Sequence, residues 1–159
     1  MIDRLLPSLP AIPKPTGFLA LPLRAIPAPL HSRTLSLILN RILADALQYR
    51  ELDFLEGRIL QITISDLSLE YRLTLSSGRL TAADTHRQPD VHFGGKLKEF
   101  MLLALNQEDP DTLFFQRRLQ LEGDTELGLE IKNFLYTLDE DLLPHTVRKI
   151  AERFVRLLD

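Results

Sequence analysis

The side chains that could perform acid–base chemistry or bind a metal form two short carboxylate runs and four scattered histidines. Glu108, Asp109 and Asp111 could bind a hard cation, and the Asp-Glu-Asp run at 139–141 could pair a general acid with a general base. A proline lies within or shortly after each run, which favours an exposed turn or a solvated linker instead. No histidine has a partner four residues away, so the spacing does not favour metal binding by His31, His86, His92 and His145.

Motifs for covalent, phosphoryl-transfer or redox catalysis are missing from the sequence. It contains no G-x-S-x-G elbow, no Walker A loop and no G-x-G-x-x-G fingerprint. It also contains no cysteine, which excludes disulfides, thiolate catalysis and cysteine-ligated clusters. We therefore predict a protein that is not an enzyme and that has no cofactor and no metal.

The distribution of charge indicates which partners to expect. The formal net charge of −3 and the lack of a basic stripe argue against nucleic-acid binding. Residues 1–50 carry six basic and two acidic side chains, residues 108–141 carry three basic and ten acidic ones, and the chain after 141 is basic again. Both ends thus favour an anionic surface. With no visible secretory signal, we predict a cytoplasmic protein that is partly peripheral to the inner membrane.

Residues 1–30 form a proline-rich apolar arm in this prediction. Seven of the ten prolines lie there between apolar residues, and proline prevents a long helix or a central strand. The longest apolar run, 17–30, is also shorter than the roughly 20 residues that a membrane span needs. The arm either packs on its own domain or a second subunit, or it inserts at a membrane interface through Phe18, Leu19, Leu21 and Leu23.

The hydrophobic periodicity predicts four helices and five strands. The helices are expected over 34–49, 96–107, 126–138 and 144–158, with Asp124 or Thr125 capping the third. The strands are expected over 60–65, 67–76, 80–82, 91–93 and 118–122, with a turn at 108–111. Because the second face of the sheet is polar, helices can cover one face only. We predict a two-layer α+β domain over 31–143 with a single antiparallel sheet of about five strands.

The last segment, 144–159, is predicted to be a basic amphipathic helix. One side carries an apolar stripe that includes Val147, Ile150 and Phe154. The helix either buries this stripe on the domain or meets an anionic membrane with the basic residues Arg148, Lys149, Arg153 and Arg156.

Aromatic and aliphatic residues are unusually dense around the last strand and its flanking helices. They are either an ordinary core or the wall of a lipid pocket. A pocket would offset the cost of exposing a hydrocarbon chain to water, at roughly 0.8 kcal/mol per buried CH₂. The candidate lipid-binding residues are Phe93, Phe100, Leu103, Leu113, Phe114, Phe115, Leu119, Leu121, Leu127, Ile131, Phe134 and Leu135.

A known family shares several of these sequence features. The segments PDVHFGG and KLKEFMLLALNQEDPDTLFFQRRLQLEGDTELGLEIKNF, between Pro89 and Phe134, resemble the sterol-carrier-protein-type lipid-binding domain. With LDFLEGR at 52–58, they resemble most closely its UbiT-type branch, the bacterial ubiquinone-biosynthesis accessory proteins. The resemblance covers about 35–138. Arg117 and Arg118 stand where the family often has glycine.

The resemblance implies a sterol-carrier-like fold with an apolar cavity and a role without catalysis. It implies an accessory factor for oxygen-independent ubiquinone synthesis, which binds prenylated quinone precursors or membrane lipids. Such a factor would present them to Fe–S hydroxylase partners of the UbiU and UbiV type. In the GDTELG motif we expect Gly123 to permit a sharp strand-to-helix reversal and Gly128 to permit close helix packing.

Other functions predict different interiors. A membrane-peripheral scaffold without an internal lipid would have no cavity beyond the size of a water molecule, and it would assemble through its termini, with a homodimer as one such assembly. A small enzyme would need polar side chains that converge inside the cavity. The lipid-binding hypothesis needs a cavity with neither a metal nor a catalytic group.

Overall fold

The computed structural model describes residues 28–159, with side chains from His31 onward. The predicted membrane contacts Phe18, Leu19, Leu21 and Leu23 lie outside the described residues.

The described chain forms helices and strands close to the predicted positions. The helical elements are α2 (Ala28–Ile42), α3 (Ala44–Gln48), η1 (Asp53–Leu55), α4 (Leu97–Ala104), α5 (Pro110–Phe115), α6 (Thr125–Tyr136) and α7 (His145–Leu157). The strands are β1 (Leu60–Ile64), β2 (Leu69–Ser76), β3 (Arg79–Ala82), β4 (Val91–Gly95) and β5 (Leu119–Gly123). The predicted helix over 34–49 begins earlier, at Ala28, and divides into α2 and α3.

The five strands form one mixed sheet in the order β3-β2-β1-β4-β5. Three neighbouring pairs are antiparallel, but β1 and β4 are parallel, with Ile62 opposite Phe93. The prediction of a purely antiparallel sheet was therefore wrong for this pair. The hairpin β2–β3 occupies one side of β1, and the chain then returns to run beside β1 in the same direction.

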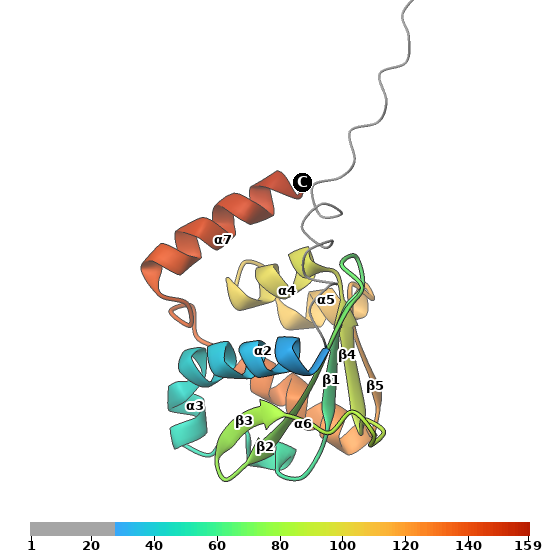
Figure 1. Cartoon of the computed structure of the whole chain (residues 1–159). Coiled ribbons are helices and arrows are strands. Elements are labelled where there is room, and N and C mark those ends of the chain that lie inside the picture. The colour runs from blue at the N-terminus through green and yellow to red at the C-terminus, as the bar shows by residue number, and fades with distance from the viewer. Residues whose placement is uncertain (1–27) are drawn as a thin grey trace, which may run out of the picture.

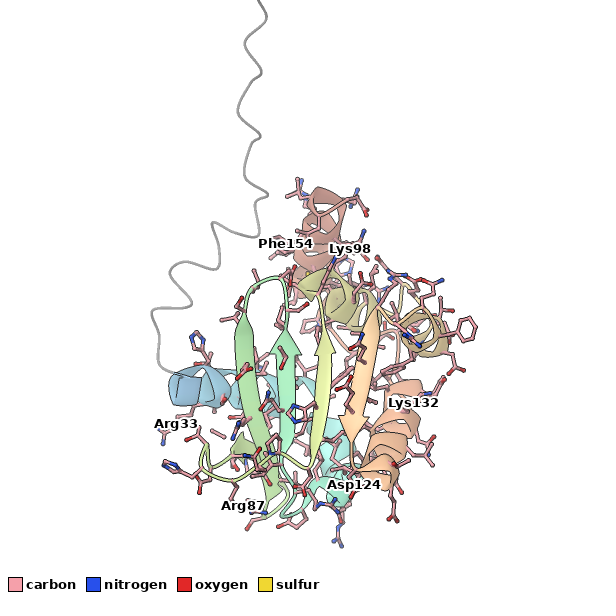
Figure 2. All side chains as sticks on the ribbon, turned by 90° about the vertical axis from the view of Figure 1, so that its right-hand side faces the viewer. Arg33, Arg87, Lys98, Asp124, Lys132 and Phe154 are labelled. Atoms are coloured by element: carbon pink, nitrogen blue, oxygen red, sulfur yellow. The ribbon has the colours of Figure 1, made fainter. Side chains whose placement is uncertain are left out.

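Within residues 28–159, helices cover one face of the sheet and leave the other bare, as predicted. Figure 1 shows the strands as one layer, with α2, α4, α5 and α6 on one side, and Figure 2 looks onto the uncovered side. Leucines such as Leu73 and Leu75 of β2 point into the core. On the other face Arg72 donates from Nε to Oε1 of Gln61 at 3.1 Å, which holds these polar side chains against the sheet.

A side chain of α2 forms hydrogen bonds with the backbone of the edge strand β3. Asn40 Nδ2 donates to the carbonyl oxygen of Leu80 at 2.7 Å, and the Leu80 N–H donates to Asn40 Oδ1 at 2.9 Å. The amide thus imitates a neighbouring strand and satisfies both backbone groups at an edge that could otherwise pair with another chain.

We expect Asn40→Ala to lower the free energy of unfolding by about 1–3 kcal/mol, because it leaves both backbone groups of Leu80 without their partners. Urea denaturation followed by circular dichroism measures the change. An exposed leucine on the same helix, Leu37, provides the control, because Leu37→Ala removes no hydrogen bond. Equal losses in the two variants would contradict this role for Asn40.

The GDTELG motif forms the predicted junction between β5 and α6. Gly123 has φ +115°, and Asp124 caps α6 by accepting from the N–H of Leu127 at 2.9 Å. This hydrogen bond, followed by that from Arg58 at 2.7 Å, lowers the pKa of the Asp124 carboxyl. The expectation for Gly128 was wrong, because a Cβ at this position would meet no atom within 4 Å. Gly123 is the glycine that the junction requires.

One α-helix was not predicted from the sequence. The run at 108–111 was interpreted as a turn, but α5 begins there, with Asp109 as its N-cap and Pro110 in its first turn. Asp109 accepts from the N–H of Thr112 at 3.1 Å. A proline is compatible with the first turn of a helix, because the N–H that it lacks would have no helical partner there.

Candidate lipid-binding cavity

An apolar cavity of about 300 Å³ lies between the inner face of the sheet and the helices that cover it. It is partly open to solvent. Its walls come from most of the fold: from α2, η1 and the four strands β1 to β4, and from α4, α6 and the segment that follows α6. The lining residues are Leu35, Leu39, Ile42, Leu43, Leu52, Phe54, Leu55, Leu60, Ile62, Ile64, Tyr71, Leu73, Leu80, Phe93, Phe100, Leu103, Ala104, Ile131, Phe134, Leu135, Leu138, Leu142 and Leu143.

The chemistry of this wall suits a hydrocarbon. Tyr71 is the only polar side chain among the described residues that line the cavity, and burial raises the pKa of its phenol. No carboxylate, histidine, lysine or arginine of the described part lines it. Within residues 28–159 there is also no group of three or more histidines and carboxylates that could hold a metal ion. The wall can therefore enclose apolar groups, but it offers no acid–base pair.

Six of the predicted lipid-binding residues line the cavity. They are Phe93, Phe100, Leu103, Ile131, Phe134 and Leu135. The rings of Phe93 and Phe100 meet edge to face, with their centroids 4.9 Å apart, and Phe134 lies against Phe54 at 6.5 Å. These residues come from β4, α4 and α6, so the fold brings together side chains from distant parts of the sequence.

The other six predicted residues do not line the cavity. Leu113, Leu119 and Leu127 are buried in the surrounding core, and Phe114 and Leu121 pack against that core while partly exposed. Phe115 is 91% exposed on α5, so its ring is part of the surface. The aromatic and aliphatic residues of this region thus lie in three places: the cavity wall, the core behind it and the protein surface.

The sequence-based prediction missed the opposite wall. The helix predicted over 34–49 was given no role in lipid binding, but Leu35, Leu39 and Ile42 of its apolar stripe line the cavity. Leu142 and Leu143, in the segment after α6, line it as well. A stripe at helical spacing identifies the side that faces inward, but it gives no information about whether that side meets another side chain or an open space.

The sequence profile of the SCP-2 sterol transfer family matches residues 38–136, which include every described strand and the helices α4 to α6. The chain belongs to this family. The resemblance found in the sequence is thereby confirmed.

Similar proteins were found by sequence and by structure. The chain is 38% identical over 132 residues to the "Ubiquinone biosynthesis accessory factor UbiT" of Escherichia coli strain K12, which covers 83% of this chain and 75% of the relative. The protein of the same name from Escherichia coli O157:H7 gives the same values. A solved structure titled "UbiJ-SCP2 Ubiquinone synthesis protein" has a TM-score of 0.55 at 18% identity, and the match covers 70% of this chain and 97% of that one. This structure supports the fold.

The departure from the SCP-2 family pattern at Arg117 and Arg118 has a structural explanation for one residue. Arg118 forms ion pairs with Glu99 at 2.6 Å and Glu108 at 2.5 Å, which join the residue before β5 to α4 and to the segment between α4 and α5. Arg117 has φ +57°, a conformation that glycine adopts more readily. The site of the departure lies outside the cavity wall.

Helix α7 buries only part of its apolar stripe against the domain. It packs on α4 through Val155 and Ala151, which contact Leu102 and Leu105. Three residues of the predicted stripe remain exposed: Val147 by 46%, Ile150 by 68% and Leu157 by 73%. In Figure 1 this helix extends beyond the other helices, and the segment before it contains Leu142 and Leu143 of the cavity wall.

The basic residues of α7 divide into two groups. Arg148 is held in place, because it donates to Glu152 at 3.1 Å and to the carbonyl oxygen of Leu105 at 3.3 Å. Lys149, Arg153 and Arg156 are exposed. Over the described part of the chain, no helix combines the length and hydropathy that crossing a membrane requires.

Proposed function

We propose that this protein is a non-catalytic lipid-binding accessory factor of ubiquinone biosynthesis, which holds a prenylated quinone precursor or a membrane lipid in its apolar cavity. The observation that carries the proposal is a cavity of about 300 Å³ without a charged group among its described lining residues. Membership of a sterol transfer family and 38% identity to a ubiquinone biosynthesis accessory factor support it. We further propose that the protein acts in an oxygen-independent branch of this pathway.

The cavity weighs against the alternative of a scaffold without an internal lipid. That alternative expects an interior with no space beyond that of a water molecule, whose share of liquid volume is about 30 Å³. The volume is near the lower end of the roughly 300–1,000 Å³ of small-molecule sites. A ring with a short prenyl segment is the size of guest that suits it, and the rest of a long tail leaves through the open side.

Helix α7 supplies the proposed contact with the membrane. Its exposed apolar residues Val147, Ile150 and Leu157 would enter the interface, while Arg153 and Lys149 would meet anionic headgroups. Arg148 has a different role here, because its bonds to Glu152 and Leu105 join α7 to the domain. Since the segment before α7 lines the cavity, a docked helix would bring the cavity close to the bilayer.

Transfer of the cargo requires an acceptor protein. We propose that Fe–S hydroxylase proteins of the UbiU and UbiV type receive the bound precursor, because the chain offers no redox group of its own. Affinity capture of the tagged full chain with each purified protein tests the contact. Light scattering of the free chain tests whether it also forms a homodimer.

We expect Ala104→Phe to remove most of the bound lipid. Ala104 lines the cavity, so its replacement places a ring in the space of the guest. The measurement is organic extraction of the purified protein, followed by mass spectrometry of the released lipids. We expect the yield to fall at least about tenfold, because a guest that loses two buried CH₂ contacts loses roughly 1.6 kcal/mol.

Leu129→Phe is the matched control, since Leu129 is 59% exposed on α6 and a ring there leaves the cavity unchanged. This control should retain the lipid of the unaltered protein. If the unaltered protein releases no lipid and binds no prenylphenol, the proposed function is wrong. Equal lipid content in both variants would place the guest elsewhere.

A further inference from the structure

The segment between α6 and α7, residues 137–144, forms one outer side of the cavity wall. Its three leucines, Leu138, Leu142 and Leu143, line the cavity. No residue of this segment is fully buried, whereas Leu73 on the opposite wall is. In Figure 1 the segment runs along the outer edge of the domain between α6 and α7. It therefore closes this side of the cavity from the surface.

Few hydrogen bonds hold the segment in place. Among residues 139–143 the backbone makes one hydrogen bond to another backbone group, from the N–H of Leu142 to the carbonyl oxygen of Asp139 at 3.2 Å. The carbonyl oxygen of Glu140 accepts from the side chain of Arg148, which belongs to α7. Exposed segments with few backbone hydrogen bonds open locally at a low cost in free energy.

Leu143 couples this part of the wall to helix α7. It lines the cavity, and it also packs against the cluster of Leu102, Leu105 and Val155 through which α7 meets α4. Only Pro144 separates Leu143 from the first residue of α7. A movement of α7 away from α4 would therefore withdraw Leu143 from the cavity wall.

The contact that holds α7 on α4 is small. Val155 is the only fully buried residue of α7. Arg148 donates to the carbonyl oxygen of Leu105 at 3.3 Å, and Lys98 of α4 forms an ion pair with Asp159, which follows α7. Ion pairs at the surface contribute little to stability. Anionic lipid would also compete with Asp159 for Lys98.

The helix and the segment before it carry opposite charges. Lys149, Arg153 and Arg156 of α7 are exposed, and so is the acidic run at 139–141. An anionic surface attracts the basic helix and repels the acidic segment. Docking of α7 on such a surface thus favours a displaced segment.

We propose that residues 137–144 cover the entrance of the cavity, and that α7 uncovers it when the helix docks on an anionic membrane. In the free protein α7 lies on α4, Leu143 stays in the wall and the guest is retained. On the membrane α7 leaves α4 and draws the segment with it, so the guest passes between the cavity and the bilayer. This inference rests on the proposed function and names how access to the same cavity is regulated.

Because the chain contains no cysteine, one introduced disulfide can lock α7 in place. Leu102→Cys with Val155→Cys introduces a pair across the contact between α4 and α7, and mass spectrometry verifies the bond. The oxidised and reduced forms of this full-length variant are loaded with a fluorescent fatty acid. Its release is then followed after mixing with phosphatidylglycerol or phosphatidylcholine vesicles.

We expect the anionic vesicles to accelerate release from the reduced form at least about tenfold over the zwitterionic ones. The reason is that an open state below about 10% of the population becomes the main one. The oxidised form should show no acceleration, although it should still co-sediment with the anionic vesicles, because its exposed apolar and basic residues are unchanged. Vesicle binding without release distinguishes the opening of the entrance from docking alone.

A second variant weakens the same contact without any membrane. Arg148→Ala removes the hydrogen bond to the carbonyl oxygen of Leu105, so release to the soluble acceptor β-cyclodextrin should become about two- to tenfold faster. Arg41→Ala is the matched control, since Arg41 is exposed on α2 and the same change of charge leaves α7 in place. This control should release the fatty acid at the original rate.

The outcomes separate this inference from the proposed function. If the unaltered chain takes up neither the fatty acid nor a prenylphenol, the lipid-binding function itself is wrong. If it takes up a guest, and the oxidised and reduced forms release it equally fast to anionic vesicles, the guest leaves by another route and the inference is overturned. Equal release from Arg148→Ala and Arg41→Ala would likewise show that α7 does not keep the entrance closed.

Discussion

Replacing both Ile150 and Leu157 of α7 with glutamate is expected to abolish binding to anionic vesicles. The two side chains are 68% and 73% exposed, and full burial of one such side chain in an apolar phase contributes about 1.5–3 kcal/mol. Losing both contributions weakens binding by roughly 100-fold or more. The glutamates would add repulsion from the anionic lipid. Co-sedimentation of the full chain with phosphatidylglycerol vesicles measures the effect.

The control is a double variant with the same change of charge on other helices. Leu37 on α2 and Leu129 on α6 are 64% and 59% exposed, so Leu37→Glu with Leu129→Glu matches the change at different places. This control should bind anionic vesicles as the unaltered protein does. If the α7 variant still binds and the control does not, α7 is not the membrane contact. If all three proteins bind equally, the contact lies elsewhere in the chain.

Gly123→Ala is expected to lower the free energy of unfolding by about 2–4 kcal/mol. A Cβ on Gly123 would lie 2.5 Å from the carbonyl oxygen of Asp90, which is a backbone atom that cannot move aside. The φ of +115° adds strain, because side-chain-bearing residues rarely adopt it, at a cost of about 1–3 kcal/mol. The midpoint of thermal unfolding should fall by roughly 5–15 °C.

A second glycine of the same motif provides the comparison. Gly128 lies within α6, and a Cβ there would meet nothing within 4 Å, so Gly128→Ala should raise stability by up to about 1 kcal/mol. Calorimetry of both variants measures the difference between them. A loss of stability in Gly128→Ala as large as that in Gly123→Ala would mean that both positions require glycine.

The sequence was sufficient to predict the elements but not their arrangement. Alternation in 60–65 and 67–76 identified β1 and β2, because a strand with one buried face has a period of two. The same alternation carries no information about which strand lies beside β1, so the parallel pairing of Leu60 with Val91 was not predicted. The start of α5 was missed because Asp109 and Pro110 favour a turn and a helix start equally.

The cavity was less predictable than the fold. Phe93, Phe100 and Phe134 were recognised as candidates from local aromatic density, but Phe115, in the same stretch, is at the surface. A cavity depends on how closely the helices approach the sheet, and this distance depends on contacts between segments that are far apart in the sequence. Helix α7 illustrates the same limit, because Val155 rather than Ile150 meets α4.

The wall of the cavity draws on eight of the twelve described helices and strands, and this affects how long the protein survives in a cell. A guest that binds only the folded chain stabilises the whole domain, by about 2.7 kcal/mol when its concentration is a hundred times the dissociation constant. Empty molecules would then unfold more often and meet proteases more often than loaded ones. The abundance of this protein would thereby follow the supply of its cargo without any dedicated sensor.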